Sequence, residues 1–384
     1  RRAVQEEEED EEDEEEDDDD DDEEDDGDYQ AASEAARERR YLSTLPPRRR
    51  REYKEDEEHL FRNAECSVPF RYRILDSHIP DAVKVQCITF VRHLDEEEGD
   101  MKRRTWLERI LRIPFGQYSV EKQRRSEAAV RVARAKSVLD QVVHGNLNAK
   151  NALREMVAQG ITCPEGRMPV IGLVGPPGIG KTTLARRGIA EVMNRPFFHI
   201  SCGGMQDAAS LRGHCYTWEG STPGAIVNAV SQTGVMDPVI LLDEADKLNN
   251  LPKGGGDVQN VLIHLLDPTQ NDTFEDEYFS GIPMDLSRAI FVLSMNDSTT
   301  ISPVLRDRVQ LIQMDTPRVS DKVEIAKGFM IPACLNNVGL PPGHVHFPDD
   351  TLHHAITTGP EEAGVRQLKY ALEAIVRRIN MFLL

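Results

Sequence analysis

The sequence contains no long hydrophobic run. None of its apolar stretches approaches the roughly 18 consecutive residues that a membrane-spanning helix needs, so we expect no contact with a membrane. The N-terminus has no apolar centre of the kind found in signal peptides, and its acidic composition is the opposite of a mitochondrial transit sequence. The chain begins with Arg1 rather than Met, which favours a processed chain or a fragment.

Cysteine is scarce and scattered. The cysteines are Cys66, Cys87, Cys163, Cys202, Cys215 and Cys334. They form no CxxC pair and no dense framework, so a zinc site and a disulfide-stapled fold are both disfavoured. Unpaired thiols are typical of a reducing intracellular compartment. We therefore expect the cytoplasm or the mitochondrial matrix.

Acidic charge is abundant only in one segment. The net charge is -21, but Glu6–Asp26 is an unbroken run of carboxylates that supplies almost all of it. The rest of the chain is nearly neutral. Like charges repel, and this run has nothing apolar to offset the entropy of ordering. We expect residues 1–55 to be a disordered tail, acidic at first and then arginine-rich.

The role of this tail stays open at the level of sequence. A solvated, disordered segment is one interpretation, and a decoy that binds basic surfaces is another. The arginine-rich part includes Arg48–Arg51, which suits an intramolecular partner for the acidic run, a nuclear-import signal or a nucleic-acid patch. The residues do not choose among these alternatives.

The remaining chain divides into three regions by its patterns. Residues 56–125 show short helical patterns, and Trp106 lies on the apolar face of one of them. Residues 126–316 contain five short apolar runs, separated mostly by helical segments, at 169–175, 196–201, 238–243, 289–296 and 309–314. Such runs are typical of parallel strands buried on both faces. Residues 317–384 are predicted to be all helical. The fold class is therefore α/β, with a small helical domain after the sheet.

A phosphate-binding motif follows the first apolar run. The stretch "GPPGIGKTT" consists of Gly175, Pro176, Pro177, Gly178, Ile179, Gly180, Lys181, Thr182 and Thr183. Glycines let backbone N–H groups surround phosphate oxygens, and the following helix adds its positive end. Lys181 is placed to reach the β- and γ-phosphates, and Thr182 to bind Mg²⁺. A strand before and a helix after the motif make a chance match improbable.

A second motif supports the first. The stretch "VILLDEAD" (239–246) is an apolar strand that ends in two carboxylates. We assign Asp243 to the Mg²⁺ site and Glu244 to polarising the attacking water as general base. An adjacent Asp-Glu pair favours an ATPase over a GTPase or a kinase. ATP and Mg²⁺ are the expected cofactors.

The chain resembles the ATPase module of the Lon protease family, which belongs to the AAA+ ring ATPases. The resemblance covers roughly residues 68–384. It rests on these segments in order: "IPDAVK", "WLERILRIPFG", "HGNLNAKNALREMVA", "GPPGIGKTTLARRGIA", "GGMQDAASLRGH", "GSTPGAIVNAV", "LLDEADK", "LLDPTQNDTFEDEYF", "PMDLSRAIFVLSMND", "PVLRDRVQLIQM" and "EEAGVRQLKYALEAIVRR". It implies a large AAA+ domain at 126–316 and a small helical domain at 317–384.

The resemblance also implies roles for single residues. Asn296 is similar to the sensor-1 residue that orients the water, and Arg366 to the sensor-2 arginine of the small domain. Arg308 is similar to the arginine finger that reaches a neighbouring subunit's nucleotide. His144 lies where the family's adenine pocket begins. A homo-oligomeric ring of six subunits, as in the family, is therefore expected to act on unfolded or damaged proteins.

The stretch "RGHCYTWEGSTPG" (212–224) places a tryptophan in a loop. Trp218 and Glu219 occupy positions where the family carries an aromatic–apolar pair that grips substrate in the ring's channel. An aromatic ring packs against most side chains without a matched hydrogen bond. Gly213, Gly220 and Gly224 are expected to let this loop move. The alternative places Trp218 in a subunit interface.

A second channel loop is expected at "KGGGD" (253–257).

Two parts of the family pattern are missing, because an acidic tail replaces the N-terminal recognition domain and no Ser-Lys peptidase dyad is recognisable. The leading hypothesis is a motor that unfolds and translocates proteins, within a Lon protease or as a stand-alone unfoldase. A regulatory protein that binds ATP without turnover and a DNA-handling AAA+ protein remain as alternatives.

Overall fold

The computed structural model describes residues 40–50, 53, 68–96, 101–119, 128–205, 207–250, 255–341 and 343–384. The chain divides into two compact units, Arg1–Val68 and Pro69–Leu384. In the first unit, residues 40–44 and 47–50 are helical, where the sequence predicts disorder. The guanidinium of Arg50 donates hydrogen bonds to the carbonyls of Leu45 and Ser43, which ties the two helical turns together. The acidic run Glu6–Asp26 lies outside the described residues.

Three helices begin the second unit, namely α3 (Phe70–Asp76), α4 (Asp81–Glu96) and α5 (Met101–Ile110). Trp106 on α5 is buried, which confirms its predicted place in the core. Its ring lies 4.9 Å from that of Phe90 and 5.5 Å from that of Phe279. Its indole N–H donates to the carbonyl of Tyr278 at 3.1 Å. These contacts join α4 and α5 to the body that carries the sheet.

The centre of this unit is a five-stranded parallel sheet. Its strands are β1 (Ile171–Val174), β2 (Phe197–Ser201), β3 (Val239–Asp243), β6 (Ile290–Met295) and β7 (Gln310–Gln313). Their order is β2-β3-β6-β1-β7, and every pair is parallel. Each strand lies within one of the five predicted apolar runs, so the predicted fold class is confirmed. The order places the carboxyl ends of β1, β3 and β6 side by side.

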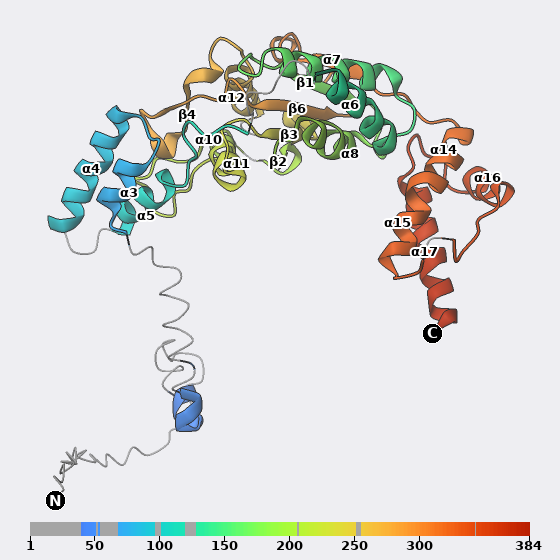
Figure 1. The fold of residues 1–384 in the computed structure, drawn as a ribbon, viewed down its shortest axis with the longest axis horizontal. Coiled ribbons are helices and arrows are strands. Elements are labelled where there is room, and N and C mark those ends of the chain that lie inside the picture. The colour runs from blue at the N-terminus through green and yellow to red at the C-terminus, as the bar shows by residue number, and fades with distance from the viewer. Residues whose placement is uncertain are drawn as a thin grey trace, which may run out of the picture. The chain divides into compact units, whose positions relative to one another are not determined.

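Alternate side chains of β1, β3 and β6 enter two separate cores. On β1, Ile171 and Leu173 pack into the cluster that includes helices α6 (Ala128–Val142) and α7 (Leu147–Thr162). The flanking Val170 and Val174 pack on the opposite face, with α11 (Ala225–Thr233) and α12 (Gly255–Leu265). Figure 1 shows the strands enclosed between helices. Each fully buried aliphatic side chain contributes roughly 1.5–3 kcal/mol, which explains why the sheet forms from such apolar sequence.

Short elements connect the strands. The helical segment after β1 consists of α8 (Lys181–Thr183), the π-type turn η2 (Leu184–Ala190) and α9 (Glu191–Met193). Between β2 and β3 lie η3 (Cys202–Gly204) and α10 (Ala209–Arg212), and after β3 comes η4 (Ala245–Asn250). A small antiparallel pair, β4 (Phe274–Glu275) and β5 (Pro283–Met284), flanks η6 (Glu277–Phe279), and η5 (Asn271–Thr273) precedes it. Helix α13 (Pro303–Arg306) leads into β7.

Every regular element among the described residues of the C-terminal segment is helical. It contains α14 (Val319–Ile325), the π-type turn η7 (Ala326–Met330), α15 (Ile331–Asn337), α16 (Asp349–Thr358) and α17 (Arg366–Leu383). These helices share a core of their own, which includes Leu335, Leu352 and Leu372. Helix α17 is amphipathic, with Leu368, Leu372 and Val376 buried on one face. No helix among the described residues has the length and apolar character needed to cross a membrane.

Candidate functional site

The loop between β1 and α8 bends around a cavity. Gly178 and Gly180 have φ angles of 80° and 95°, which residues with a Cβ rarely adopt. The "GPPGIG" sequence therefore permits a turn that directs the loop toward the start of α8. A cavity of about 860 Å³ lies against this loop, bordered also by the ends of β3 and β6 and by the C-terminal helices. Its volume lies within the usual range for a small-molecule site.

Lys181 points back into the loop. Its ammonium donates hydrogen bonds to the carbonyl of Pro176 at 3.1 Å and to Oδ1 of Asn296 at 2.9 Å, and it also bonds to the carbonyl of Gly175. Burial lowers the pKa of Lys181, while the nearby carboxylates, Asp246 first among them, act in the opposite direction. The structure thus places a buried cation where the phosphates are expected.

Asp243 ends β3 beside the helix that follows the loop. Its Oδ2 accepts a hydrogen bond from the hydroxyl of Thr182 at 3.2 Å and lies 3.1 Å from Nε2 of His199. Burial acts to raise the pKa of Asp243, but hydrogen bonds from Ser294, His199 and Thr182 outweigh it and hold the pKa below its usual value. A carboxylate that stays ionised next to a hydroxyl is a donor set that suits Mg²⁺, which prefers oxygen ligands.

The described residues contain no group of three or more His, Cys, Asp or Glu side chains arranged for a metal ion. A nucleotide-bound Mg²⁺ does not require such a group, because one or two protein oxygens are completed by phosphates and water. Thr182 and Asp243 therefore fit the metal that the sequence assigns to them. The described cysteines, Cys87, Cys163, Cys202, Cys215 and Cys334, are all free thiols.

Glu244 has an unusual backbone. Its φ is 58°, a value that costs free energy for a residue other than glycine and is concentrated at functional sites. Its N–H donates to Oδ1 of Asp243 at 3.1 Å. The side chain packs on Gly203, where a Cβ would lie only 2.2 Å from Oε2 of Glu244. Glu244 borders the cavity, so its strained turn places this residue beside the phosphate loop.

Asn296 follows β6 and lies between two charged groups. Its backbone N–H donates to Oδ2 of Asp246 at 3.1 Å, and its side-chain oxygen accepts from Lys181. Asp246 is buried, and its Oδ1 has no hydrogen-bond partner. The sequence alone predicts no role for Asp246, Ser294 or His199. The second Asp of "DEAD" was the available signal for Asp246, whereas His199 on β2 carries no local signal of its contact with Asp243.

The C-terminal helices close the cavity from the other side. Arg366 and His144 both border it. The N–H of Val365 donates to the carbonyl of Gly178 at 3.2 Å, and a Cβ on Gly364 would lie 2.3 Å from the carbonyl of Pro177. The start of α17 therefore touches the phosphate loop so closely that only glycine fits there.

Helix α17 is held at this position by a carboxylate. Both oxygens of Glu362 accept backbone N–H groups of the first turn, from Gln367 and Leu368, at 2.9 Å each. The ammonium of the mostly buried Lys322 donates to the backbone carbonyl of Glu362 at 2.6 Å. These bonds fix the first turn of α17, and with it Arg366, against the cavity.

Arg308 lies outside the cavity. Its guanidinium donates to Oδ2 of Asp267 through Nε at 3.2 Å and Nη2 at 2.9 Å, and to the carbonyl of Val304. The hydrogen bonds of Thr269, followed by those of Arg308, lower the pKa of Asp267 to about 2. The structure does not bring Arg308 together with the other predicted site residues of the same chain.

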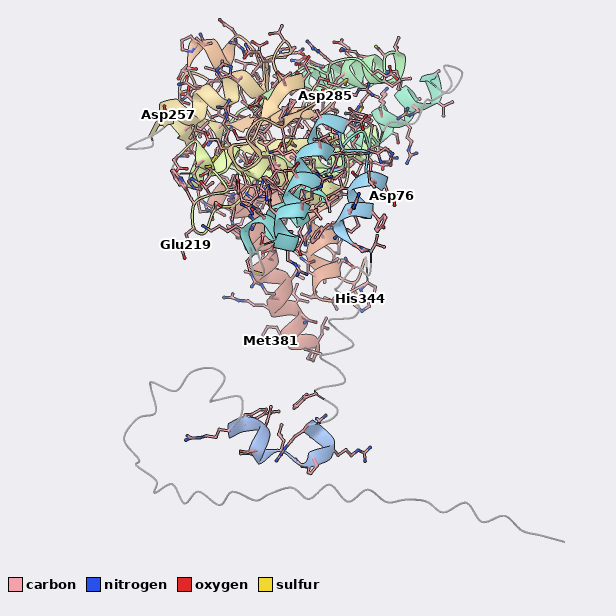
Figure 2. The ribbon with its side chains drawn as sticks, turned by 90° about the vertical axis from the view of Figure 1, so that its left-hand side faces the viewer. Asp76, Glu219, Asp257, Asp285, His344 and Met381 are labelled. Atoms are coloured by element: carbon pink, nitrogen blue, oxygen red, sulfur yellow. The ribbon has the colours of Figure 1, made fainter. Side chains whose placement is uncertain are left out.

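The loop that carries Trp218 is also separate from the cavity. Trp218 is 62% exposed, and its ring stacks on His214 with the centroids 5.8 Å apart. Glu219 is exposed, and in Figure 2 it lies at the margin of the folded body, toward the same side as Asp257. Asp257 ends the predicted second channel loop, of which residues 253–254 lie outside the described residues.

Comparisons with known proteins relate this chain to a family of ATPases. Residues 171–315 match the family described as "ATPase family associated with various cellular activities (AAA)". The chain is 37% identical over 277 residues to a Lon protease of Halothermothrix orenii, covering 72% of this chain and 34% of that protein. It is 34% identical over 315 residues to a mitochondrial Lon protease homolog of Saccharomyces cerevisiae, covering 80% and 27%. It is 37% identical over 282 residues to a peroxisomal Lon protease homolog 2 of Oryza sativa, covering 73% and 31%.

The parallel sheet, the phosphate loop and the carboxylates at the end of β3 define an AAA+ nucleotide-binding module. The comparisons specify it further, and the chain carries an AAA+ ATPase module of the Lon protease family. The resemblance inferred from the sequence is thereby confirmed. The chain spans only between 27% and 34% of the length of these three relatives.

Proposed function

We propose that this module hydrolyses ATP with Mg²⁺ and uses the energy to unfold protein substrates and to translocate them. We further propose that it does so within an ATP-dependent protease whose Ser-Lys peptidase lies outside these residues. The observation that carries the proposal is the convergence of Lys181, Asp243, Glu244, Asn296 and Arg366 on one cavity, with an exposed aromatic loop elsewhere on the body. The names of the relatives, all Lon proteases or their homologs, support the protease context.

We place ATP in this cavity, and the residues on its border support that placement. Its phosphates lie in the loop Gly175–Thr183, with Lys181 against the β- and γ-phosphates. His144 lies at the adenine end, and Arg366 approaches from the helical domain. We propose that the chain consists of a tail at 1–55, a helical region at 56–125, a large domain at 126–316 and a small domain at 317–384. The proposed nucleotide position lies between the last two. Nucleotide then bridges the two domains.

Hydrolysis uses water as the nucleophile. Glu244 accepts a proton from the water as its oxygen attacks the γ-phosphorus, and Asn296 orients that water. The bond between the γ-phosphorus and the bridging oxygen breaks, which leaves ADP and inorganic phosphate. Mg²⁺ bound to Thr182 and Asp243 would neutralise negative charge on the phosphates. Lys181 stabilises the same charge from inside the loop.

Assembly into a ring completes this site. Because Arg308 lies outside the cavity of its own chain, we propose that it acts on the nucleotide of a neighbouring subunit. A homo-oligomeric ring, with six subunits by resemblance to the family, supplies that neighbour. The ring's channel would then hold Trp218 and Glu219, which contact an unfolded or damaged protein as it is translocated.

The test measures phosphate release by the full 384-residue chain with and without an unfolded protein such as reduced, carboxymethylated albumin. We expect Mg²⁺-dependent turnover that the unfolded protein stimulates. Glu244→Gln is expected to bind ATP but to turn it over at least about a hundredfold more slowly, the usual scale for a lost general base. Undiminished turnover in this variant would remove Glu244 from the role. Stimulation by duplex DNA but not by protein would favour the DNA-handling alternative.

A further inference from the structure

The two ends of the Trp218 loop lie close together beside one buried carboxyl group, which is hydrogen-bonded to one of them. The N–H of Gly224 donates to Oδ2 of Asp276 at 2.8 Å, and the N–H of His214 donates to the carbonyl of Thr222 at 3.3 Å. A Cβ on Gly213 would lie 2.8 Å from Oδ1 of Asp276, and the φ of Gly213 is 78°. Asp276 is 0% exposed, so its hydrogen bonds do not compete with water.

The glycines at these ends therefore serve close packing. A Cβ on Gly224 would lie 2.0 Å from the carbonyl of Leu211, and one on Gly213 would lie 2.8 Å from the N–H nitrogen of Gly224. The sequence led us to expect that both glycines give the loop freedom to move. The structure shows instead that they allow two backbone segments to approach, whereas a Cβ on Gly220 would meet open space.

The middle of the loop is held by helix α5. The ammonium of Lys102 donates to the carbonyl of Thr217 at 3.0 Å, and the guanidinium of Arg109 donates to the carbonyl of Ser221 at 3.1 Å. These two carbonyls stand on either side of Trp218. Arg109 also covers the ring of Tyr278, at 5.0 Å from its centroid.

The same helix is bonded to the segment that carries Asp276. Oδ1 of Asp276 accepts the N–H of Tyr278 at 2.9 Å, and the carbonyl of Tyr278 accepts the indole N–H of Trp106. The ring of Tyr216, in the loop, lies 6.4 Å from that of Trp106. Helix α5, the loop and η6 are thus joined by polar and aromatic contacts, and Trp218 remains exposed on the outside.

We propose that Lys102, Arg109 and Asp276, the α5 bracket, are positioning residues that hold the Trp218 loop at a fixed place. The bracket makes α5, which lies outside the ATPase sheet, part of the substrate-gripping device. The expected effect on substrate rests on the proposed function. The fixing of the loop by these residues does not depend on that function. The bracket is expected to matter for turnover stimulated by substrate and not for basal turnover, because none of its members borders the nucleotide cavity.

The test combines Lys102→Met with Arg109→Met in the full chain. The first measurement is the rate of amide hydrogen exchange in residues 214–221. The second is the ratio of protein-stimulated to basal ATP turnover. We expect exchange to accelerate by about tenfold, since two hydrogen bonds of ordinary net strength are lost. We expect the stimulation ratio to fall toward one while basal turnover stays within about twofold.

Matched variants separate positioning from general damage. Arg104→Met changes another exposed cation of α5, whose Nε contacts Glu108 and not the loop, and is expected to change neither measurement. Lys102→Arg with Arg109→Lys keeps a donor at each position and is expected to restore most of the stimulation. Asp276→Asn tests the third member, because its amide cannot accept N–H groups at both terminal atoms.

The outcomes are distinct. Unchanged amide exchange in the double Met variant overturns the bracket, and faster exchange with full stimulation overturns its role in gripping substrate. Trp218→Ala is measured in parallel. If that variant keeps its stimulation, the gripping function fails, while the exchange measurement still decides whether α5 holds the loop.

Discussion

The ammonium of Lys181 is hydrogen-bonded to Oδ1 of Asn296 at 2.9 Å. This bond joins the phosphate loop after β1 to the end of β6, two strands that are neighbours in the sheet but are far apart in the sequence. It sets the distance between the cation that we propose contacts the phosphates and the amide that we propose orients water. The chemistry of the site therefore depends on the order of the strands as well as on the motifs.

Asn296→Ala is expected to lower kcat of ATP turnover by about ten- to a hundredfold with a small effect on KM. The variant removes the polar group that we propose orients the attacking water, while Lys181 keeps its carbonyl partners in the loop. Steady-state phosphate release at varied ATP concentrations measures both constants. A rise in KM with unchanged kcat would assign Asn296 to nucleotide binding instead.

Gly203→Ala is expected to lower ATP turnover because it displaces the carboxylate of Glu244. The added methyl would lie 2.2 Å from Oε2 of Glu244, so this carboxylate must move. A misplaced general base typically costs about ten- to a hundredfold in rate. Gly204→Ala is the control, because its methyl meets nothing within 4 Å. Equal turnover in the two variants, at equal melting temperature, would contradict the proposed position of the base.

Arg308→Ala is expected to abolish turnover in rings made only of this variant. An arginine finger contributes roughly 10³–10⁵ in rate. Mixing Arg308→Ala subunits with Lys181→Ala subunits is expected to recover part of the activity, because some sites then combine an intact loop with a neighbour's arginine. Specific activity of the unaltered protein is expected to rise with its concentration. No recovery together with a flat concentration profile would show that Arg308 does not act between subunits.

Asp276→Asn is expected to change how stability depends on pH. Burial raises the pKa of Asp276 from 3.8 to about 7, against the lowering effect of its backbone hydrogen bonds. Between these two values the folded chain binds a proton that the unfolded chain does not. The stability that Asp276 contributes is thus fully present below about pH 4 and falls as the pH rises to about 7.

The measurement is the free energy of unfolding from urea titrations of both proteins between pH 5 and pH 8. The difference, unaltered protein minus Asp276→Asn, is expected to decrease with rising pH and to level off above about pH 7. A difference that increases over this range would mean that the carboxyl has a lowered pKa in the folded chain.

The sheet and the phosphate loop can be predicted from the sequence because both depend on local signals. The strand at 239–243 is a continuous apolar run, and the loop at 175–183 has a spacing that few other structures need. The structure of each of these segments is determined by properties of its own few residues. The five strands lie where such runs predict them, and the residues of both motifs meet at one cavity.

Contacts between distant segments cannot be predicted from local sequence in this way. Lys102 and Thr217 are 115 positions apart, and neither has a local pattern that specifies the other. Gly213 and Gly224 illustrate the limit, since a glycine in a loop suits both movement and close packing, and only the position of Asp276 distinguishes them. The positive φ of Glu244 likewise depends on its surroundings, because its sequence does not require it.

The rate at which the full chain unfolds a tagged fluorescent protein, measured together with its basal ATP turnover, tests the proposed motor most directly. In Trp218→Ala we expect unfolding to be lost while basal turnover stays within about threefold, because the loop does not touch the phosphate site. Trp218→Phe, which keeps an aromatic ring, is expected to retain much of the unfolding rate. Unfolding by Trp218→Ala at the normal rate would contradict the proposal that this loop grips the substrate.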